Sequence, residues 1–220
     1  MAAGENELKS ELIRAGRYLL ENELAWGNAG NMSLRLDPGR FLITASGAGL
    51  GELDEADLVA CPLEGEGEYA RRPSKELPMH RAIYQARPEI QAVLHASPFY
   101  STLVACSDLD APADLFVEAM YYLERTARVP YHHPGAAELG EAVRARARQA
   151  NVLFLENHGV LVYDTSLGEA LMGLHTLEQA CRMLVAARCA GLPFKRLPAE
   201  TVQDFLQNSG YRRRRDWPEL

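Results

Sequence analysis

Apolar residues near the start of the chain recur at helical spacing. Leucine and alanine side chains fall three or four positions apart over residues 8–20, which predicts an amphipathic helix ending near Glu23. The pattern then changes to that of strands over residues 31–36 and 41–44, which flank the turn sequence Asp37-Pro38-Gly39. We therefore expect a helix followed by a β-hairpin.

From residue 74 onward, short apolar strand patterns alternate with helical ones. Three helices have N-terminal signals: Ser74 as an N-cap, Ser97 as an N-cap with Pro98 after it, and Ser166 with Glu169 as a capping box. Strands interspersed with helices favour an α/β or α+β fold with one sheet covered by helices. The expected elements are helices over 75–86, from 98, over 135–150 and from 167 to Gly191, with strands over 92–95, 152–155 and 160–163.

The chain is expected to form one domain over residues 1–220. Its 220 residues are 47% hydrophobic, which is enough for one large core, and no repeat or linker divides them. Residues 192–220 are expected to form a C-terminal helix and tail. The four arginines at 212–215 are interpreted as a solvated tail or a clasp between subunits.

Charge and cysteine content exclude several classes of function. Acidic residues outnumber basic ones by 30 to 23, and the net charge of -7 argues against a nucleic-acid partner. The N-terminus lacks a leader pattern and no segment is apolar enough to span a membrane, so we expect a cytoplasmic protein. The four cysteines lack CxxC spacing, which argues against a disulfide framework or a cysteine-bound metal.

Two histidines and one glutamate are candidates for chemistry. His95 ends a predicted strand and His158 lies between two later strands, and α/β folds build sites at strand ends. Glu76 lies near a predicted helix N-terminus, with His80 on the same helix face. Each also has a structural interpretation: packing for the histidines, and interaction with the helix dipole for Glu76. The residues alone leave a metal ligand, a general base and a structural role open.

Several short motifs together resemble a known family. Their order and spacing over roughly residues 8–190 are similar to those of the class II aldolase/adducin family, which includes sugar-phosphate aldolases, an epimerase and a dehydratase. The resemblance implies an α/β/α domain with a mainly antiparallel central sheet and a homotetramer with sites between subunits. The motifs are Gly30-Asn31-Met32-Ser33, Ile43-Thr44-Ala45-Ser46-Gly47, Pro73-Ser74-Lys75-Glu76-Leu77-Pro78-Met79-His80, Ala92-Val93-Leu94-His95, Pro130-Tyr131 and Asn157-His158-Gly159-Val160-Leu161.

The resemblance also implies roles for individual residues. Glu76 corresponds to the catalytic acid/base, and His95 and His158 to two of three metal-binding histidines. Tyr131 corresponds to a tyrosine that donates a proton into the neighbouring subunit's site, and Tyr211 is a weaker candidate for a second one. The residues implied to hold the substrate phosphate are Asn31, Ser46, Gly47 and Ser74, with Lys75 beside them.

Two positions depart from the family's pattern. The family normally has His-x-His at the strand end, whereas this chain has His95-Ala96-Ser97, and a serine hydroxyl is a poor zinc ligand. His132 or His133 could supply a replacement imidazole, although an exposed loop position is the simpler interpretation of both. Lys75 stands where the aldolases commonly have a small hydroxyl residue. Its ammonium could bind phosphate or carboxylate, or extend into solvent.

The residues and the resemblance together predict a metal-dependent lyase. A divalent ion, with zinc as the expected metal, would stabilise an enediolate while a keto-sugar phosphate is cleaved. Epimerase, dehydratase and decarboxylase chemistry remain alternatives within the family. A catalytically silent binding or assembly protein is a further alternative because Ser97 replaces a ligand.

Overall fold

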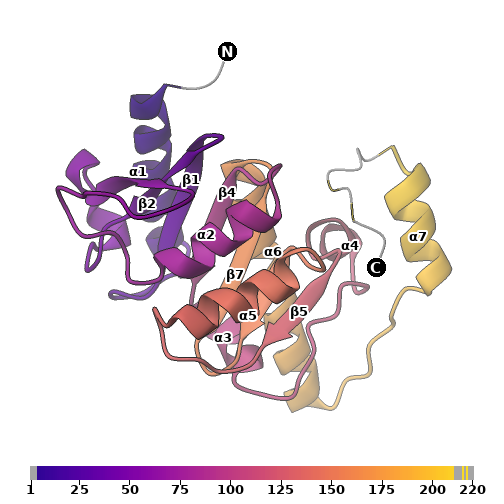
Figure 1. The fold of residues 1–220 in the computed structure, drawn as a ribbon. Coiled ribbons are helices and arrows are strands. Elements are labelled where there is room, and N and C mark those ends of the chain that lie inside the picture. The colour runs from indigo at the N-terminus through magenta and orange to yellow at the C-terminus, as the bar shows by residue number, and fades with distance from the viewer. Residues whose placement is uncertain (1–3, 211–214, 216, 218–220) are drawn as a thin grey trace.

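A seven-stranded sheet runs through the protein, of which this computed structural model describes residues 4–210, 215 and 217 (Figure 1). The strands are β1 (Asn31–Asp37), β2 (Arg40–Thr44), β3 (Leu58–Pro62), β4 (Ala92–Ala96), β5 (Thr126–Val129), β6 (Val152–Leu155) and β7 (Gly159–Asp164). Their order is β3-β2-β1-β4-β7-β6-β5, and only the β5–β6 pair is parallel. The predicted mainly antiparallel central sheet is confirmed.

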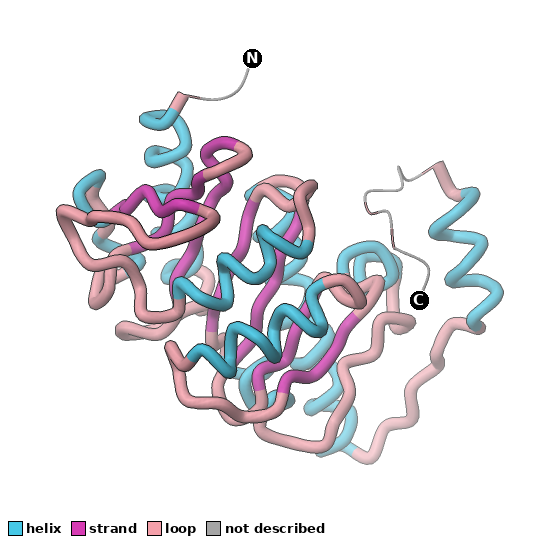
Figure 2. The backbone as a smooth tube through the Cα atoms, viewed as in Figure 1, coloured by secondary structure: helices cyan, strands magenta, loops and turns pink. Residues whose placement is uncertain are grey.

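Helices cover both faces of this sheet, as Figure 2 shows. Strand side chains alternate between the two faces: Leu94 and Val162 join one core, whereas Val93 and Leu161 join the other. The first core is covered by α1 (Glu5–Glu21), α3 (Phe99–Ala105), α4 (Val117–Tyr122) and α6 (Leu167–Ala190), and the second by α2 (Leu77–Ala86) and α5 (Ala137–Ala147).

A last helix, α7 (Ala199–Asn208), lies apart from the sheet and is reached by an extended segment after α6 (Figure 1). It is the predicted C-terminal helix. Within the described part of the chain, no helix has the length and apolar character needed to cross a membrane.

Elements with strong local signals form where the sequence predicts them. In the β1–β2 hairpin, the Asp37 carboxylate accepts a hydrogen bond from the Gly39 amide at 2.9 Å, which closes the predicted turn. The Ser166 hydroxyl accepts from the Glu169 amide at 3.2 Å, and Gly191 ends α6 in the left-handed conformation with φ 64°.

The start of α2 differs from the prediction. The helix begins at Leu77, two residues later than expected, because Ser74 closes a separate turn before it. The Ser74 hydroxyl accepts from the Glu76 amide at 3.3 Å, and its carbonyl accepts from the Leu77 amide at 3.0 Å. Glu76 therefore occupies the N-cap position and not the first helical turn. The helix predicted over 135–150 is also shorter, since α5 spans 137–147.

The prediction that Ser97 caps α3 is wrong. Pro98 is the N-cap residue, and no side chain from the cap position bonds the helix. The carboxylate of Glu178 on α6 accepts instead from the backbone amides of Tyr100 and Ser101, at 2.9 and 2.8 Å. A carboxylate at a helix N-terminus satisfies free amide donors and interacts favourably with the helix dipole. The Ser97 hydroxyl is therefore not needed as a cap.

Arg215 departs from the interpretation of the arginine run as a solvated tail, and Arg212, Arg213 and Arg214 lie outside the described residues. The side chain of Arg215 is buried and forms an ion pair with Asp164 at the end of β7. Its guanidinium also lies 3.4 Å from the Glu124 carboxylate, which accepts a hydrogen bond from the Trp217 indole at 2.5 Å. Tyr211, a candidate proton donor, lies outside the described residues.

Candidate active site

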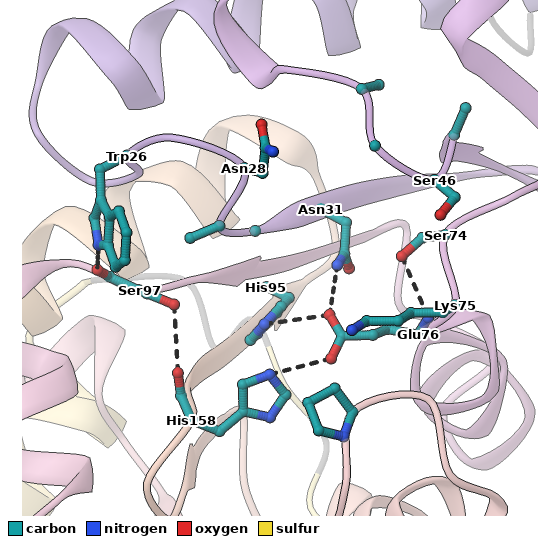
Figure 3. Close-up of a pocket in the computed structure, with 16 residues that line it drawn as sticks. Trp26, Asn28, Asn31, Ser46, Ser74, Lys75, Glu76, His95, Ser97 and His158 are labelled. Atoms are coloured by element: carbon teal, nitrogen blue, oxygen red, sulfur yellow. Dashed lines mark hydrogen bonds and ion pairs between the residues drawn. The ribbon is translucent and has the colours of Figure 1, made fainter.

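A polar pocket of about 290 Å³ opens where several loops meet the ends of the central strands (Figure 3). The loops come from six separate parts of the sequence: before β1, after β2, before α2, after β4, after β5 and between β6 and β7. The pocket is lined by Trp26, Asn28, Asn31, Ser46, Gly47, Ser74, Lys75, Glu76, His95, Ser97 and His158, among others. The predicted metal, acid/base and phosphate residues thus lie around one cavity, with the exception of Tyr131.

Glu76, His95 and His158 form a group that we call the Glu–His–His cluster. Their ligand atoms all lie within 4.8 Å of one another. An oxygen of Glu76 lies 3.4 Å from Nε2 of His95, and its other oxygen lies 3.1 Å from Nε2 of His158. The antiparallel pairing of β4 with β7 brings the two histidines together across 63 residues of sequence, counted from 95 to 158.

Two glycines allow the chain to approach β4 closely beside the cluster. A Cβ at Gly159, which follows His158, would lie 2.7 Å from a backbone oxygen of β4. Gly30, which precedes Asn31, has φ 100°, and a Cβ there would lie 2.8 Å from the backbone oxygen of His95. Larger residues at either position would push pocket side chains away from the cluster.

A buried hydrogen-bonded chain orients Glu76. The amide of Asn31 donates to Glu76 at 2.6 Å, so its carbonyl oxygen faces Nε2 of His80, also at 2.6 Å. The other nitrogen of His80 lies 2.7 Å from the Ser33 hydroxyl. Burial lowers the pKa of His80 to about 3, so the ring stays neutral. Sequence analysis placed His80 on the same face as Glu76 but did not assign it this orienting contact.

The carboxyl of Glu76 is ionised although only 4% of it is exposed. Burial acts to raise its pKa, but the contacts with His158, His95 and the Asn31 amide outweigh burial and lower the pKa to about 2. A buried carboxylate with this surrounding is a base or a ligand at neutral pH.

The residues present fit a divalent metal ion. Nδ1 of His95 lies 3.0 Å from the Val160 carbonyl, which can only accept, so Nδ1 carries the hydrogen. Burial lowers the pKa of His95, and its Nε2 faces the Glu76 carboxylate. Nδ1 of His158 is buried with no hydrogen-bond partner among the described residues. Two imidazoles and a carboxylate whose ligand atoms lie within 4.8 Å of one another suit divalent transition metals.

Residues expected to hold phosphate lie on one side of the cluster. Ser46 and Gly47 come from the loop after β2, and Ser74 lies beside Ser46 (Figure 3). Lys75 is exposed and is the one lysine or arginine in the described pocket lining, and Figure 3 shows its side chain extended beside Glu76. Their contact with phosphate stays a prediction.

Two lining residues, Trp26 and Asn28, were not found from the sequence. Both lie in the loop between α1 and β1, and Gly27 between them is in the left-handed conformation with φ 53°. An exposed tryptophan in a loop has no periodicity or spacing that marks it as part of a site. Only the tertiary structure brings this loop to the cluster.

The loop that follows β5 does not complete the cluster within one chain. Tyr131 is 49% exposed, and its hydroxyl lies 3.1 Å from Nδ1 of His133. Neither His132 nor His133 joins the candidate metal ligands of the described chain. Ser97 is not a ligand either, since its hydroxyl points to the His158 carbonyl at 3.4 Å. The role of Tyr131 in a neighbouring subunit's site stays a prediction.

The layered fold and the carboxylate–imidazole pocket define a domain of the class II aldolase type. The family model for the Class II Aldolase and Adducin N-terminal domain matches residues 10–185, and the chain belongs to this family. The resemblance noted from the motifs is thereby confirmed.

Named proteins and a solved structure are similar to this chain over most of their length. A 3-oxo-tetronate 4-phosphate decarboxylase from Haemophilus influenzae is 32% identical over 206 residues, which cover 92% of this chain and 97% of that protein. An L-fuculose phosphate aldolase from Methanococcus vannielii is 33% identical over 175 residues, or 79% of this chain and 93% of that protein. The structure of YgbL, a candidate aldolase/epimerase/decarboxylase from Klebsiella pneumoniae, has a TM-score of 0.84 and 32% identity over 92% of this chain and 99% of that one.

Proposed function

We propose that this protein is a metal-dependent decarboxylase that acts on a phosphorylated 3-oxo sugar acid of the 3-oxo-tetronate 4-phosphate type. The observation that carries the proposal is the Glu–His–His cluster, which joins an ionised buried carboxylate to two imidazoles at the base of a polar pocket. The decarboxylase from Haemophilus influenzae supports the reaction because the similarity covers nearly the whole of both chains.

The pocket lining offers donors for the phosphate of the proposed substrate. The proposed substrate carries a carboxylate in addition to its phosphate. Ser46, Gly47 and Ser74 offer hydroxyl and amide donors to the phosphate, and Lys75 adds a point charge that a hydroxyl residue would not supply. Asn31, the fifth predicted phosphate residue, binds Glu76 through its amide and would reach phosphate only with its second amide hydrogen.

Glu76 is proposed to carry the protons of the reaction. As an ionised base, it accepts the hydroxyl proton on carbon 2 of the substrate. The bond between carbons 1 and 2 then breaks, carbon dioxide leaves, and the electron pair passes into the ketone at carbon 3 to give an enediolate. Glu76 returns its proton to carbon 2, and water supplies the one further proton that decarboxylation consumes. The product is dihydroxyacetone phosphate.

His95 and His158 are proposed to hold a divalent ion. When bound, the ion supplies positive charge to the hydroxyl and ketone oxygens of the substrate as the electron pair moves. Zinc is the metal expected from the resemblance, whereas two imidazoles with a carboxylate also suit iron and manganese. The Asn31–His80–Ser33 chain holds Glu76 in place beside the two imidazoles.

Retro-aldol cleavage of a ketose phosphate is the second candidate. It uses the same pocket and the same ionised Glu76 as a base, and the Methanococcus aldolase supports it. In this reaction the departing aldehyde or its partner needs a proton, for which Tyr131 of a neighbouring subunit is proposed. Tyr131 is half exposed and lies outside its own pocket, as a residue that serves a homotetramer interface would.

Product analysis tests the proposal. Purified protein is loaded separately with zinc, manganese and cobalt, and metal content is measured. Each form is then given 3-oxo-tetronate 4-phosphate or L-fuculose 1-phosphate. We expect carbon dioxide and dihydroxyacetone phosphate in equal amounts from the first substrate. Cleavage of the second alone would favour the aldolase, and turnover of neither by metal-loaded protein would favour a silent homologue.

A further inference from the structure

The end of the pocket opposite the phosphate residues has an aromatic wall. We propose that Trp26 is a specificity-determining residue whose indole face contacts the substrate carboxylate that leaves as carbon dioxide. The inference rests on the proposed decarboxylation and adds to it the part of the protein that receives the departing group.

Trp26 is fixed and at the same time open to the pocket. The residue is 63% exposed, yet its indole nitrogen donates to the Ser97 carbonyl at 2.9 Å. Indole has no second polar group, so the ring offers only an apolar surface to a ligand. The hydrogen bond holds the ring in one orientation, which reduces the entropy lost when a ligand binds against it.

The arrangement of the pocket assigns this wall to the carboxylate end. Figure 3 shows Trp26 and Ser97 on one side of the Glu–His–His cluster, and Ser46 and Ser74 on the other. The proposed substrate carries phosphate on carbon 4, ketone and hydroxyl on carbons 3 and 2, and carboxylate on carbon 1. With the phosphate at the serines and the middle carbons at the cluster, carbon 1 points toward Trp26.

The small side chain of Ser97 adds to the space at this end. A histidine there, as the family normally has, would place an imidazole beside His95. In this chain the Ser97 hydroxyl donates to the His158 carbonyl. The Ser97 carbonyl accepts the hydrogen bond from the Trp26 indole. The pocket can therefore accept a substrate group where the family pattern has a metal ligand.

An apolar wall favours loss of carbon dioxide for a physical reason. A carboxylate against an indole face loses part of its hydration, whereas the neutral carbon dioxide that forms has little hydration to lose. The contact therefore disfavours the bound acid relative to the transition state. Such an effect increases kcat and leaves KM similar or higher.

Kinetics of two variants at this position test the inference. Trp26→Ala opens the wall to water, and Trp26→Phe keeps an apolar ring without the hydrogen bond to Ser97. For 3-oxo-tetronate 4-phosphate we expect Trp26→Ala to lower kcat by about tenfold with KM changed by less than about threefold, and Trp26→Phe to keep most of kcat. Unchanged kcat in Trp26→Ala, or a loss that appears only in KM, would overturn the proposal.

Fluorescence provides a readout that does not depend on turnover. The chain has two tryptophans, so Trp217→Phe leaves Trp26 as the only one. Erythronate 4-phosphate has the carboxylate but no ketone and cannot decarboxylate in this way, while glycerol 3-phosphate lacks the carboxylate. We expect the first to change Trp26 emission strongly and the second weakly. Equal responses at saturation would overturn the inference.

The two experiments separate failure of the inference from failure of the proposed function. If Trp217→Phe does not fold, the difference between wild-type and Trp26→Phe emission gives the same signal. A carboxylate-dependent response in a protein that does not decarboxylate would refute the reaction and retain the contact. Decarboxylation without any effect of Trp26→Ala would retain the reaction and refute the role of the indole.

Discussion

Two of the buried carboxylates among the described residues, Asp164 and Glu76, have different surroundings. Asp164 is 1% exposed, is paired with the Arg215 guanidinium, and accepts from the Thr165 amide at 2.8 Å. Glu76 is 4% exposed and contacts the Asn31 amide and two imidazoles. Among the described residues, no lysine or arginine lies within ion-pair distance of Glu76.

The difference separates a structural charge from a functional one. At the end of β7 the protein supplies the countercharge from its own sequence, so the carboxylate there contributes to the fold. At the pocket the described residues supply an amide and two imidazoles but no lysine or arginine, which leaves room for an external cation or a substrate proton at the carboxylate. Removing the arginine at β7 should therefore lower mainly stability, and removing the charge of Glu76 should lower mainly activity.

The largest effect is expected from breaking the ion pair between Asp164 and Arg215. Arg215→Met leaves Asp164 buried without its guanidinium, and loss of one partner from a buried pair typically costs about 3–5 kcal/mol. We expect the free energy of unfolding in urea to fall by about that amount. The double variant Asp164→Asn/Arg215→Met is the control and should lose less than the two single changes added together. Strict additivity would mean that the pair does not interact.

The main effect of changing Glu76 is expected in turnover. Glu76→Gln keeps the shape of the side chain and removes its charge, so we expect turnover to fall by about a hundredfold or more. The free energy of unfolding should also fall at neutral pH, because the lowered pKa of Glu76 means that its contacts favour the charged form in the folded state. Steady-state kinetics and urea unfolding of the same preparation check both. Unchanged turnover of a confirmed substrate would show that Glu76 moves no proton.

Whether a sequence-based prediction holds depends on how far apart the two interacting residues lie along the chain. The hairpin turn at Asp37 and the ends of α6 at Ser166 and Gly191 have their partners within a few residues, and the structure confirms them. Ser97 has a good local signal for a cap, but Glu178, about 80 residues away, takes that role. Arg215 looks solvated because its partner lies 51 residues earlier.

The Glu–His–His cluster is intermediate between the predictions that hold and those that fail. No spacing along the chain connects Glu76 to His95 and His158, because the pairing of β4 with β7 and the turn before α2 bring them together. The resemblance to a family supplied that grouping. It could not supply Trp26, which lies in none of the motifs that carry the resemblance.

A smaller effect is expected from a substitution at Ser97, which tests the candidate metal site. Ser97→His adds an imidazole two residues after His95, where alternate residues of an extended segment share a face. We expect the variant to retain zinc about tenfold more strongly against a chelator, since each protein ligand adds affinity. Ser97→Ala is the matched control for loss of the hydroxyl. Equal retention by the two variants would show that position 97 does not face the ion.

The smallest effect concerns α3, the helix that follows Ser97. It tests whether the Glu178 carboxylate or the Ser97 hydroxyl caps this helix. Because Glu178 accepts from the amides of Tyr100 and Ser101, Glu178→Ala should lower the free energy of unfolding by about 1 kcal/mol. Ser97→Ala should change it by less than about 0.5 kcal/mol, because its hydroxyl has no capping bond to lose. Urea unfolding of both variants decides between them. A larger loss in Ser97→Ala would restore serine as the cap, and Ser97→His could then not be read as a change of the metal site alone.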